Sequence, residues 1–371
     1  MSRAMTTGLM SHAASAPSSR TARIARARRA FRFGWLAFVV APLLTAAQAM
    51  AADHLPASIQ ALLPAAKAEG SFNIFGYTYN PAQQAALRED VSKFYGFPIA
   101  INFSSGSHVS EAAQLVAAIE QHVPTDLDVL WTSATQMALL GEANGLERID
   151  WPKTIGVAPA LQLRPYGIRS HDTALSVIVY NTNLVKPADV PKSFDDLLDP
   201  KWKGRIDTPR SPNPWVDLAF AIGDDKVTRL LTKLMQDQGM KLLPTYPDAR
   251  VRVATGEFAL GVGADVFILE HQGAPVKIAP VPPLVLAPAA YSVMIDAKHP
   301  NLAKLWGYWA SSPAGQHAVA DLWGASLATT PGTDTYKLAQ EIGDVKVLTY
   351  EFAATQFKAL AVKYSKIMGI R

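Results

Sequence analysis

Apolar and polar residues follow two patterns along this chain: short apolar runs, and longer stretches with one apolar face. The apolar runs at residues 71–76, 99–103 and 127–131 predict strands, and a stretch with helical spacing follows each of them. In the first such stretch, Leu87 and Val91 share one face. Strands and helices that alternate at this spacing predict an α/β fold with a parallel sheet and helices on its faces.

The first of these helices has residues typical of both helix ends. Asn80 is suited to the N-cap, Pro81 to the first helical position and Gly96 to the C-terminal end. A Ser-Ser-Gly-Ser turn at residues 104–107 precedes the next helix. The two helices should therefore begin directly after the carboxyl ends of their strands.

The carboxyl ends of parallel strands lie at one edge of a sheet, where such proteins bind ligands. The residues expected there are Tyr77, Tyr79, Ser104, Ser105, Ser107, Trp131 and Thr132. The serines at a helix start can bind a carboxylate or phosphate, or they can cap a polar turn. The aromatic residues can stack on a planar ligand, or they can pack in the core.

The second half of the chain repeats the alternation after a polar, broken stretch at residues 166–173. We interpret this stretch as a crossing into a second lobe, and the proline-rich residues 280–288 as a stiff connector back. The candidate ligand-binding residues of this half are Arg210, Asn213, Trp215, Asp265 and Tyr291. Arg210 can pair with an anionic group or be a solvated surface residue, and Asp265 can hold an amine or order Arg210.

Residues 193–206 read Ser-Phe-Asp-Asp-Leu-Leu-Asp-Pro-Lys-Trp-Lys-Gly-Arg-Ile. Ser193 can cap a short helix, Pro200 ends it, and Gly204 allows a turn into a strand. The segment predicts a helix, a break and a strand, which serve as framework of the second lobe.

The net charge of +4 comes from the beginning of the chain. Residues 1–51 contain seven arginines and no acidic residue, and the remainder has 28 basic and 31 acidic residues. The remainder is therefore weakly acidic, which gives no electrostatic basis for binding nucleic acid.

Residues 1–51 are typical of a signal peptide. A basic segment precedes an apolar run at residues 33–47, and Ala49-Met50-Ala51 is suited to cleavage near Ala51. Arg28-Arg29 also resembles a twin-arginine signal, so export by the Sec route and by the twin-arginine route remain alternatives. Both place the product in the periplasm.

The chemistry of common enzymes is not indicated. The chain has no cysteine, which excludes thiolate metal sites and thiol nucleophiles. Ser107 and His108 are adjacent at a helix start and do not face each other, and no Gly-x-Ser-x-Gly elbow or Walker loop is present. We expect no catalytic residue, no metal ligand and no cofactor.

Residues 194–206 resemble a signature of family 1 extracellular solute-binding proteins, the receptors of ABC importers, and are closest to the branch of ferric-ion and thiamine binding proteins. Residues 254–262 and 296–316 resemble further parts of this family. The resemblance implies a two-lobed type II periplasmic binding protein fold, with a mixed, mostly parallel sheet flanked by helices in each lobe and a hinge between them. Lobe 1 would comprise residues 52–170 plus 284–325, and lobe 2 residues 171–283 plus 326–371.

The resemblance also implies a function. The expected protein is a monomer that captures a small organic, anionic solute between its lobes and delivers it to an inner-membrane permease with a cytoplasmic ATPase. Ferric-binding members carry two adjacent tyrosines after the second-lobe strand, whereas residues 263–267 here contain none. The alternatives are a receptor that feeds a membrane sensor, and a binding protein for a cationic ligand such as a polyamine.

Overall fold

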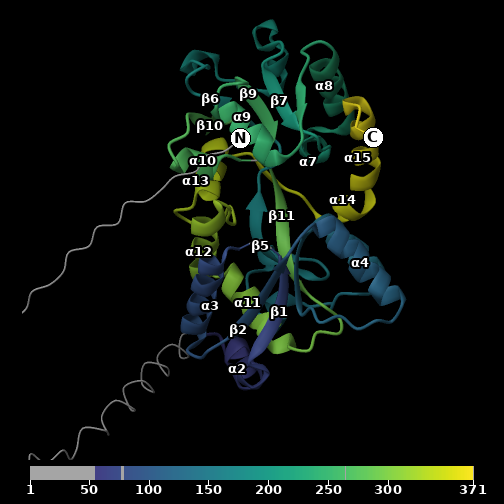
Figure 1. Ribbon diagram of the computed structural model, residues 1–371, viewed down its shortest axis with the longest axis vertical. Helices are drawn as coiled ribbons and strands as arrows, with labels where there is room; N and C mark the ends of the chain where they lie inside the picture. The colour runs from purple at the N-terminus through teal and green to yellow at the C-terminus, as the bar shows by residue number, and fades with distance from the viewer. Residues whose placement is uncertain (1–54, 77–78, 264, 371) are drawn as a thin grey trace, which may run out of the picture. The chain divides into compact units, whose positions relative to one another are not determined.

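The computed structural model describes residues 55–76, 79–263 and 265–370, and among them it forms two β-sheets flanked by helices (Figure 1). The predicted signal peptide lies outside the described residues. No helix in the described ranges is long and apolar enough to cross a membrane.

The first sheet has seven strands in the order β2-β1-β3-β11-β5-β4, with β12 paired to β11. Its strands are β1 Ser71–Gly76, β2 Ala100–Ser105, β3 Val129–Ser133, β4 Gln162–Leu163, β5 Gly167–Thr173, β11 Leu284–Val293 and β12 Val345–Val347. As predicted, β1 is parallel to both β2 and β3, whereas β11 is antiparallel to β3 and β5.

The second sheet has five strands in the order β10-β6-β9-β7-β8. These are β6 Val177–Asn181, β7 Ile206–Pro209, β8 Lys241–Leu243, β9 Leu260–Gly263 and β10 Val276–Ile278. Strand β7 is parallel to β8 and β9, and β6 is antiparallel to β9 and β10. Both sheets are therefore mixed, and the α/β class is confirmed.

Helices connect and cover the strands. Those before the second sheet are α2 Ala57–Glu69, α3 Pro81–Tyr95, α4 His108–Glu120, α5 Ala134–Glu142 and α6 Trp151–Ile155. Those within and after it are α7 Asn213–Ile222, α8 Asp224–Gln236, α9 Tyr246–Ala254, α10 Phe267–His271, α11 Pro300–Ser311, α12 Pro313–Trp323, α13 Asp334–Ile342, α14 Tyr350–Thr355 and α15 Phe357–Met368. Short 3-10 helices occupy Pro159–Leu161, Pro187–Asp189, Phe194–Leu198 and Pro200–Trp202.

The predicted ends of the first helix are confirmed. The Asn80 side chain accepts a hydrogen bond from the Gln83 backbone, and the Gln83 side chain accepts one from the Asn80 backbone. Gly96 ends the helix at a φ of 73°, which a residue with a Cβ rarely adopts. The two caps thus fix where α3 begins and where it ends.

The polar stretch at residues 166–173 differs from its prediction, because most of it forms strand β5 of the first sheet. Its buried polar side chains have partners from other segments. Ser170 donates a hydrogen bond to the Ala289 carbonyl at 3.1 Å, and Asp172 accepts one from the Ala328 amide at 2.9 Å. These contacts between distant segments cannot be read from local sequence. The chain passes to the second sheet between β5 and β6, where Leu175 lies.

The proline-rich connector also differs from its prediction, because β11 begins at Leu284 and includes Pro288. Pro288 pairs in register with Asp172 of β5. Strand β11 lies between β3 and β5 in the first sheet (Figure 1). The supposed connector is therefore part of the first sheet.

Residues 193–206 form the predicted succession, with a difference in helix type. Ser193 caps a 3-10 helix at Phe194–Leu198 with a reciprocal bond from Asp196, and β7 follows at Ile206. Trp202 is buried, and the cationic groups of Lys201 and Arg205 lie 5.0 and 5.6 Å from its ring centroid. This arrangement holds β7 in place, as expected of framework.

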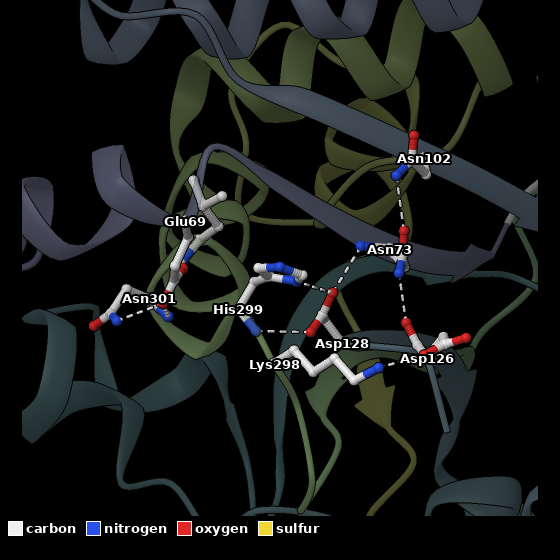
Figure 2. A network of polar contacts seen from close by, with 9 residues as sticks. Glu69, Asn73, Asn102, Asp126, Asp128, Lys298, His299 and Asn301 are labelled. Carbon is white, nitrogen blue, oxygen red and sulfur yellow. Dashed lines mark hydrogen bonds and ion pairs between the residues drawn. The ribbon is translucent and has the colours of Figure 1, made fainter. Parts of the chain in front are cut away.

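A polar network joins the amino-terminal ends of β1 and β3 to the segment before α11 (Figure 2). Asp128 accepts hydrogen bonds from the backbone amides of Asn73 and His299 at 2.8 and 2.9 Å. Glu69 accepts bonds from the amides of Asn301 and Leu302 at 3.1 and 2.7 Å. Glu69 thereby satisfies donors at the start of α11 that the helix itself cannot pair.

Candidate functional site

The carboxyl ends of the three parallel strands lie side by side, as the sequence predicts. Gly76 pairs with Ser105, and Phe75 pairs with Leu130. A Cβ atom on Gly76 would lie 3.2 Å from the Cβ atom of Trp131, so β1 passes close to this residue. Tyr77 lies outside the described residues.

In the serine turn at residues 104–107, one serine caps a helix, which is one of the two predicted alternatives. Ser107 is the N-cap of α4, and its hydroxyl accepts a hydrogen bond from the Ser110 amide at 3.3 Å. Ser104 donates a bond to the Ile74 carbonyl at 3.2 Å. Ser104, Ser105 and Ser107 are all exposed, and their contact with a ligand stays a prediction.

Two histidines flank Trp131 at this edge. The ring of His171 stacks on Trp131 at 5.4 Å with an interplanar angle of 10°, and the ring of His108 meets it at 4.6 Å and 68°. Trp131 Nε1 donates a hydrogen bond to Ser170 Oγ at 3.2 Å. Sequence reasoning missed His171 and Ser170 as neighbours of this edge, because residues 166–173 resemble a loop and carry no motif.

Burial keeps both histidine rings neutral at neutral pH. Burial lowers the pKa of His108 below its ordinary value, and it lowers the pKa of His171 to about 3. The cluster therefore provides an aromatic, uncharged wall. Attraction for an anion has to come from other groups.

Helix α5 begins at the same edge. Ser133 occupies its N-cap position without donating or accepting a capping bond, so its side chain leaves the first backbone donors unpaired. Thr132 Oγ1 instead donates to Gln136 Oε1 at 3.4 Å, and Ser133 Oγ donates to the same oxygen. An uncapped helix start of this kind favours an anion, through its free donors and its dipole.

Three of the predicted aromatic residues are buried in the hydrophobic core. Tyr79, Trp215 and Tyr291 are 7%, 0% and 3% exposed. The rings of Tyr79 and Phe103 lie 5.3 Å apart, and those of Tyr291 and Trp306 lie 5.5 Å apart. For all three, this position favours the packing alternative over stacking on a solute.

The polar candidates of the second sheet lie near β7 and β9. Arg210 follows β7 and is exposed, and its backbone amide donates to the Leu243 carbonyl at 2.7 Å. The Asn213 amide donates to Ser211 Oγ at 3.3 Å. Burial raises the pKa of Asp265 to about 6. Within the described part of the chain, no hydrogen bond or ion pair joins Asp265 to Arg210.

A cavity of about 1130 Å³ lies between strand β11 of the first sheet and helix α7, which follows strand β7 of the second sheet. It is lined by the start of α5, by α7, by β11 and by α15, including Ser133, Gln136, Asn213, Asp217, Pro288 and Lys366. A volume of this size accommodates a small organic solute. Of the predicted site residues, Asn213 lines this cavity directly, and Thr132 precedes its lining residue Ser133.

Asp217 is the most unusual residue of the cavity wall, and sequence reasoning missed it. Its side chain is 2% exposed, and Oδ2 has no hydrogen-bond partner. Burial raises the pKa of this carboxyl to about 7. A lone aspartate inside an apolar helix gives no signal by itself, because the cavity is formed by segments distant in sequence.

A resident metal is not indicated. In residues 55–76, 79–263 and 265–370, no group of three or more histidine, aspartate or glutamate side chains is placed to hold a metal ion. The site therefore offers helix starts, hydroxyls, a buried carboxylate and an aromatic wall, which are groups suited to binding an organic solute.

Solved structures place the fold in a known class. An iron-bound HitA from Pseudomonas aeruginosa has 18% identity and a TM-score of 0.63, and the match covers 79% of this chain and 99% of that chain. AfuA from Actinobacillus pleuropneumoniae, with fructose-6-phosphate bound, has 21% identity and a TM-score of 0.62, over 81% and 99%. AgtB from Agrobacterium tumefaciens R10, in complex with agropinic acid, has 15% identity and a TM-score of 0.57, also over 81% and 99%. The fold is that of type II periplasmic binding proteins, as expected.

The model of a bacterial extracellular solute-binding protein family matches residues 86–342. The chain belongs to this family. A search of curated proteins gives no match. Membership confirms an extracellular solute-binding protein, which is a binding protein and not an enzyme.

Proposed function

We propose that this protein is a periplasmic receptor that captures a small organic anion between two lobes and delivers it to an ABC permease. The observation that carries the proposal is the uncapped start of α5, which opens onto the cavity of about 1130 Å³. Free backbone donors at the positive end of a helix form a site for a carboxylate or phosphate. The serine turn at the start of α4 and Arg210 supply further donors.

The lobes of the proposal are residues 52–170 plus 284–325 and residues 171–283 plus 326–371. The first range holds most of the first sheet and the second range holds the second sheet, but β12 and the last residues of β5 belong to the first sheet and fall in the second range. A solute that contacts both lobes stabilises the closed form, because only that form contacts the solute from both sides. The permease would then recognise the closed complex.

The known structures of similar fold do not identify the solute, because HitA is iron-bound, AfuA binds fructose-6-phosphate and AgtB is in complex with agropinic acid. The residues of this chain argue against ferric iron. Residues 263–267, where ferric-binding members carry two tyrosines, contain none. The groups at the cavity favour an organic anion instead.

A thermal-shift screen of the mature protein tests this function. The screen would include carboxylates, phosphonates, sugar phosphates, polyamines and ferric ion. A solute at a hundred times its dissociation constant should stabilise the protein by about 2.7 kcal/mol, which raises the midpoint measurably. A shift with polyamines or ferric ion alone would contradict the anion, and turnover of a bound compound would contradict the receptor.

Export is tested separately. We propose that the signal peptide is removed near Ala51 and that the mature chain is a monomer in the periplasm. Mass spectrometry of protein isolated from the periplasm should give an N-terminus at Ala52. A conservative change of Arg28 and Arg29 to lysine stops twin-arginine export and leaves Sec export intact, so it separates the two routes.

A further inference from the structure

The cavity holds a charged group that an anionic solute does not use. Asp217 lies one helical turn after Asn213 on α7, and both residues line the cavity. The side chain of Asp217 is 2% exposed, and its Oδ2 atom has no hydrogen-bond partner. A buried carboxylate oxygen without a hydrogen bond is costly for folding, so Oδ2 is suited to a partner that the described chain does not provide.

The cations of the chain do not fill this role. Lys358 and Lys366 of α15 also line the cavity, yet both are exposed. No ion pair joins either lysine to Asp217 in the described ranges. Burial and the charge of Asp217 raise the pKa of the neighbouring Tyr246, whose hydroxyl donates a hydrogen bond to Ser211 Oγ at 3.1 Å instead of to Asp217.

We propose that the solute carries an ammonium group and that Asp217 binds this group inside the cavity. The inference rests on the proposed function and names its substrate class: a zwitterion whose acidic group lies at the start of α5. Burial raises the pKa of the empty Asp217 carboxyl to about 7. An ammonium group beside it favours the ionised form, so binding near neutral pH releases a proton from Asp217.

Matched pairs of probes test the inference on the mature protein at pH 8. The pairs are 4-aminobutyrate with butyrate, and phosphoethanolamine with ethyl phosphate, so that the members of each pair differ in the ammonium group. The ammonium member of at least one pair should bind about tenfold more tightly by calorimetry, because a charge-assisted hydrogen bond is gained. Equal affinity within every pair, including no binding by any member, would overturn the inference.

The variant Asp217→Asn should abolish the preference for the ammonium member, and the control Asp321→Asn should retain it. Asp321 is an exposed carboxylate on α12, so it provides the same chemical change away from the cavity. A preference that persists in Asp217→Asn would also overturn the assignment. Urea unfolding of each variant shows that it is folded.

The inference and the proposed function fail in different ways. If butyrate or ethyl phosphate binds as tightly as its ammonium partner, the receptor for an anion stands and the role of Asp217 is wrong. If the receptor function itself is wrong, the screen of solutes described above gives no anion-dependent shift in the wild-type protein or in Asp217→Asn.

Discussion

Asp128 and Asp217 are buried to the same extent, yet their surroundings are opposite. They are 1% and 2% exposed. Asp128 accepts hydrogen bonds from the amides of Asn73 and His299 and from His299 Nδ1, at 2.8, 2.9 and 2.9 Å (Figure 2). The Oδ2 atom of Asp217 has none. Burial alone therefore does not tell what a carboxylate does.

The partners of the two residues show the difference in role. Asp128 joins β1, β3 and the segment before α11, so it holds the amino-terminal edge of the first sheet. Among the described residues, the Oδ2 atom of Asp217 has no hydrogen-bond partner, and Asp217 lines the cavity. A buried oxygen without a partner costs stability, and Asp217 combines this cost with a position at the cavity. The comparison thus assigns Asp128 to the framework of the fold and Asp217 to the proposed binding site.

The largest expected effect is the loss of Asp128. The variant Asp128→Ala leaves the half-buried amides of Asn73 and His299 without their acceptor, so we expect a loss of about 3 kcal/mol in the free energy of unfolding. Urea denaturation measures it. Asp126→Ala is the control, because Asp126 is exposed and pairs with Lys298, and it should change little. A loss under about 1 kcal/mol for Asp128→Ala would contradict the framework role.

Asp217→Asn should raise the free energy of unfolding, whereas Asp128→Ala should lower it. Burial raises the pKa of Asp217 to about 7, above its unfolded value, so the folded state holds a proton that the unfolded state has lost at intermediate pH. Stability from this group is then greatest at acidic pH and falls as pH rises to about 7. At pH 8 the variant should be more stable than wild type by about 2 kcal/mol.

The check is urea denaturation of both proteins from pH 4 to pH 8. The gain from Asp217→Asn should shrink toward pH 4, where the folded wild-type chain holds the proton and the unfolded chain begins to bind it. A gain that does not depend on pH, or a loss at pH 8, would show that Asp217 has a partner in solution and would remove the contrast with Asp128.

Asp207 sharpens the comparison, because it is buried without a partner and lies away from the large cavity. Both of its carboxyl oxygens lack hydrogen bonds, and burial and the nearby Glu257 raise its pKa to about 8. Asp207→Asn should stabilise the protein by about 2 kcal/mol at pH 8, as Asp217→Asn does, and the gain should disappear at acidic pH. Calorimetry should show solute affinity unchanged, whereas a large loss of affinity would mean that Asp207 also belongs to the site.

The smallest expected effect concerns Arg210, the exposed arginine that follows β7. Arg210→Gln should weaken binding of the anionic solute about fivefold, since an exposed charge contributes about 1 kcal/mol. Arg229→Gln on α8 is the matched control. An unchanged affinity for Arg210→Gln would assign the anion to the start of α5 alone.

The sequence predicts the fold well where the signals are local. Asn80, Pro81 and Gly96 mark α3 correctly, and Ser193 and Pro200 mark the segment before β7. It fails at residues 166–173 and 284–288, because β5 and β11 are held by pairing with distant strands. Local composition there resembles a loop.

The site is less predictable for the same reason. Asn213 and the residues around Thr132 follow from the rule that ligands lie at strand ends. His171 and Asp217 have no local signal, because their neighbours come from α4, β3, α5 and α15. Trp215 is a candidate ligand-binding residue by its position in the sequence, but its side chain is fully buried in the core.

The central claim is that the protein carries an organic solute with an acidic group. The most direct test is native mass spectrometry of protein isolated from the periplasm, followed by identification of any retained molecule. The account predicts one small solute per chain, with an acidic group and an amine. Retention of ferric ion, or of a solute without an acidic group, would contradict it.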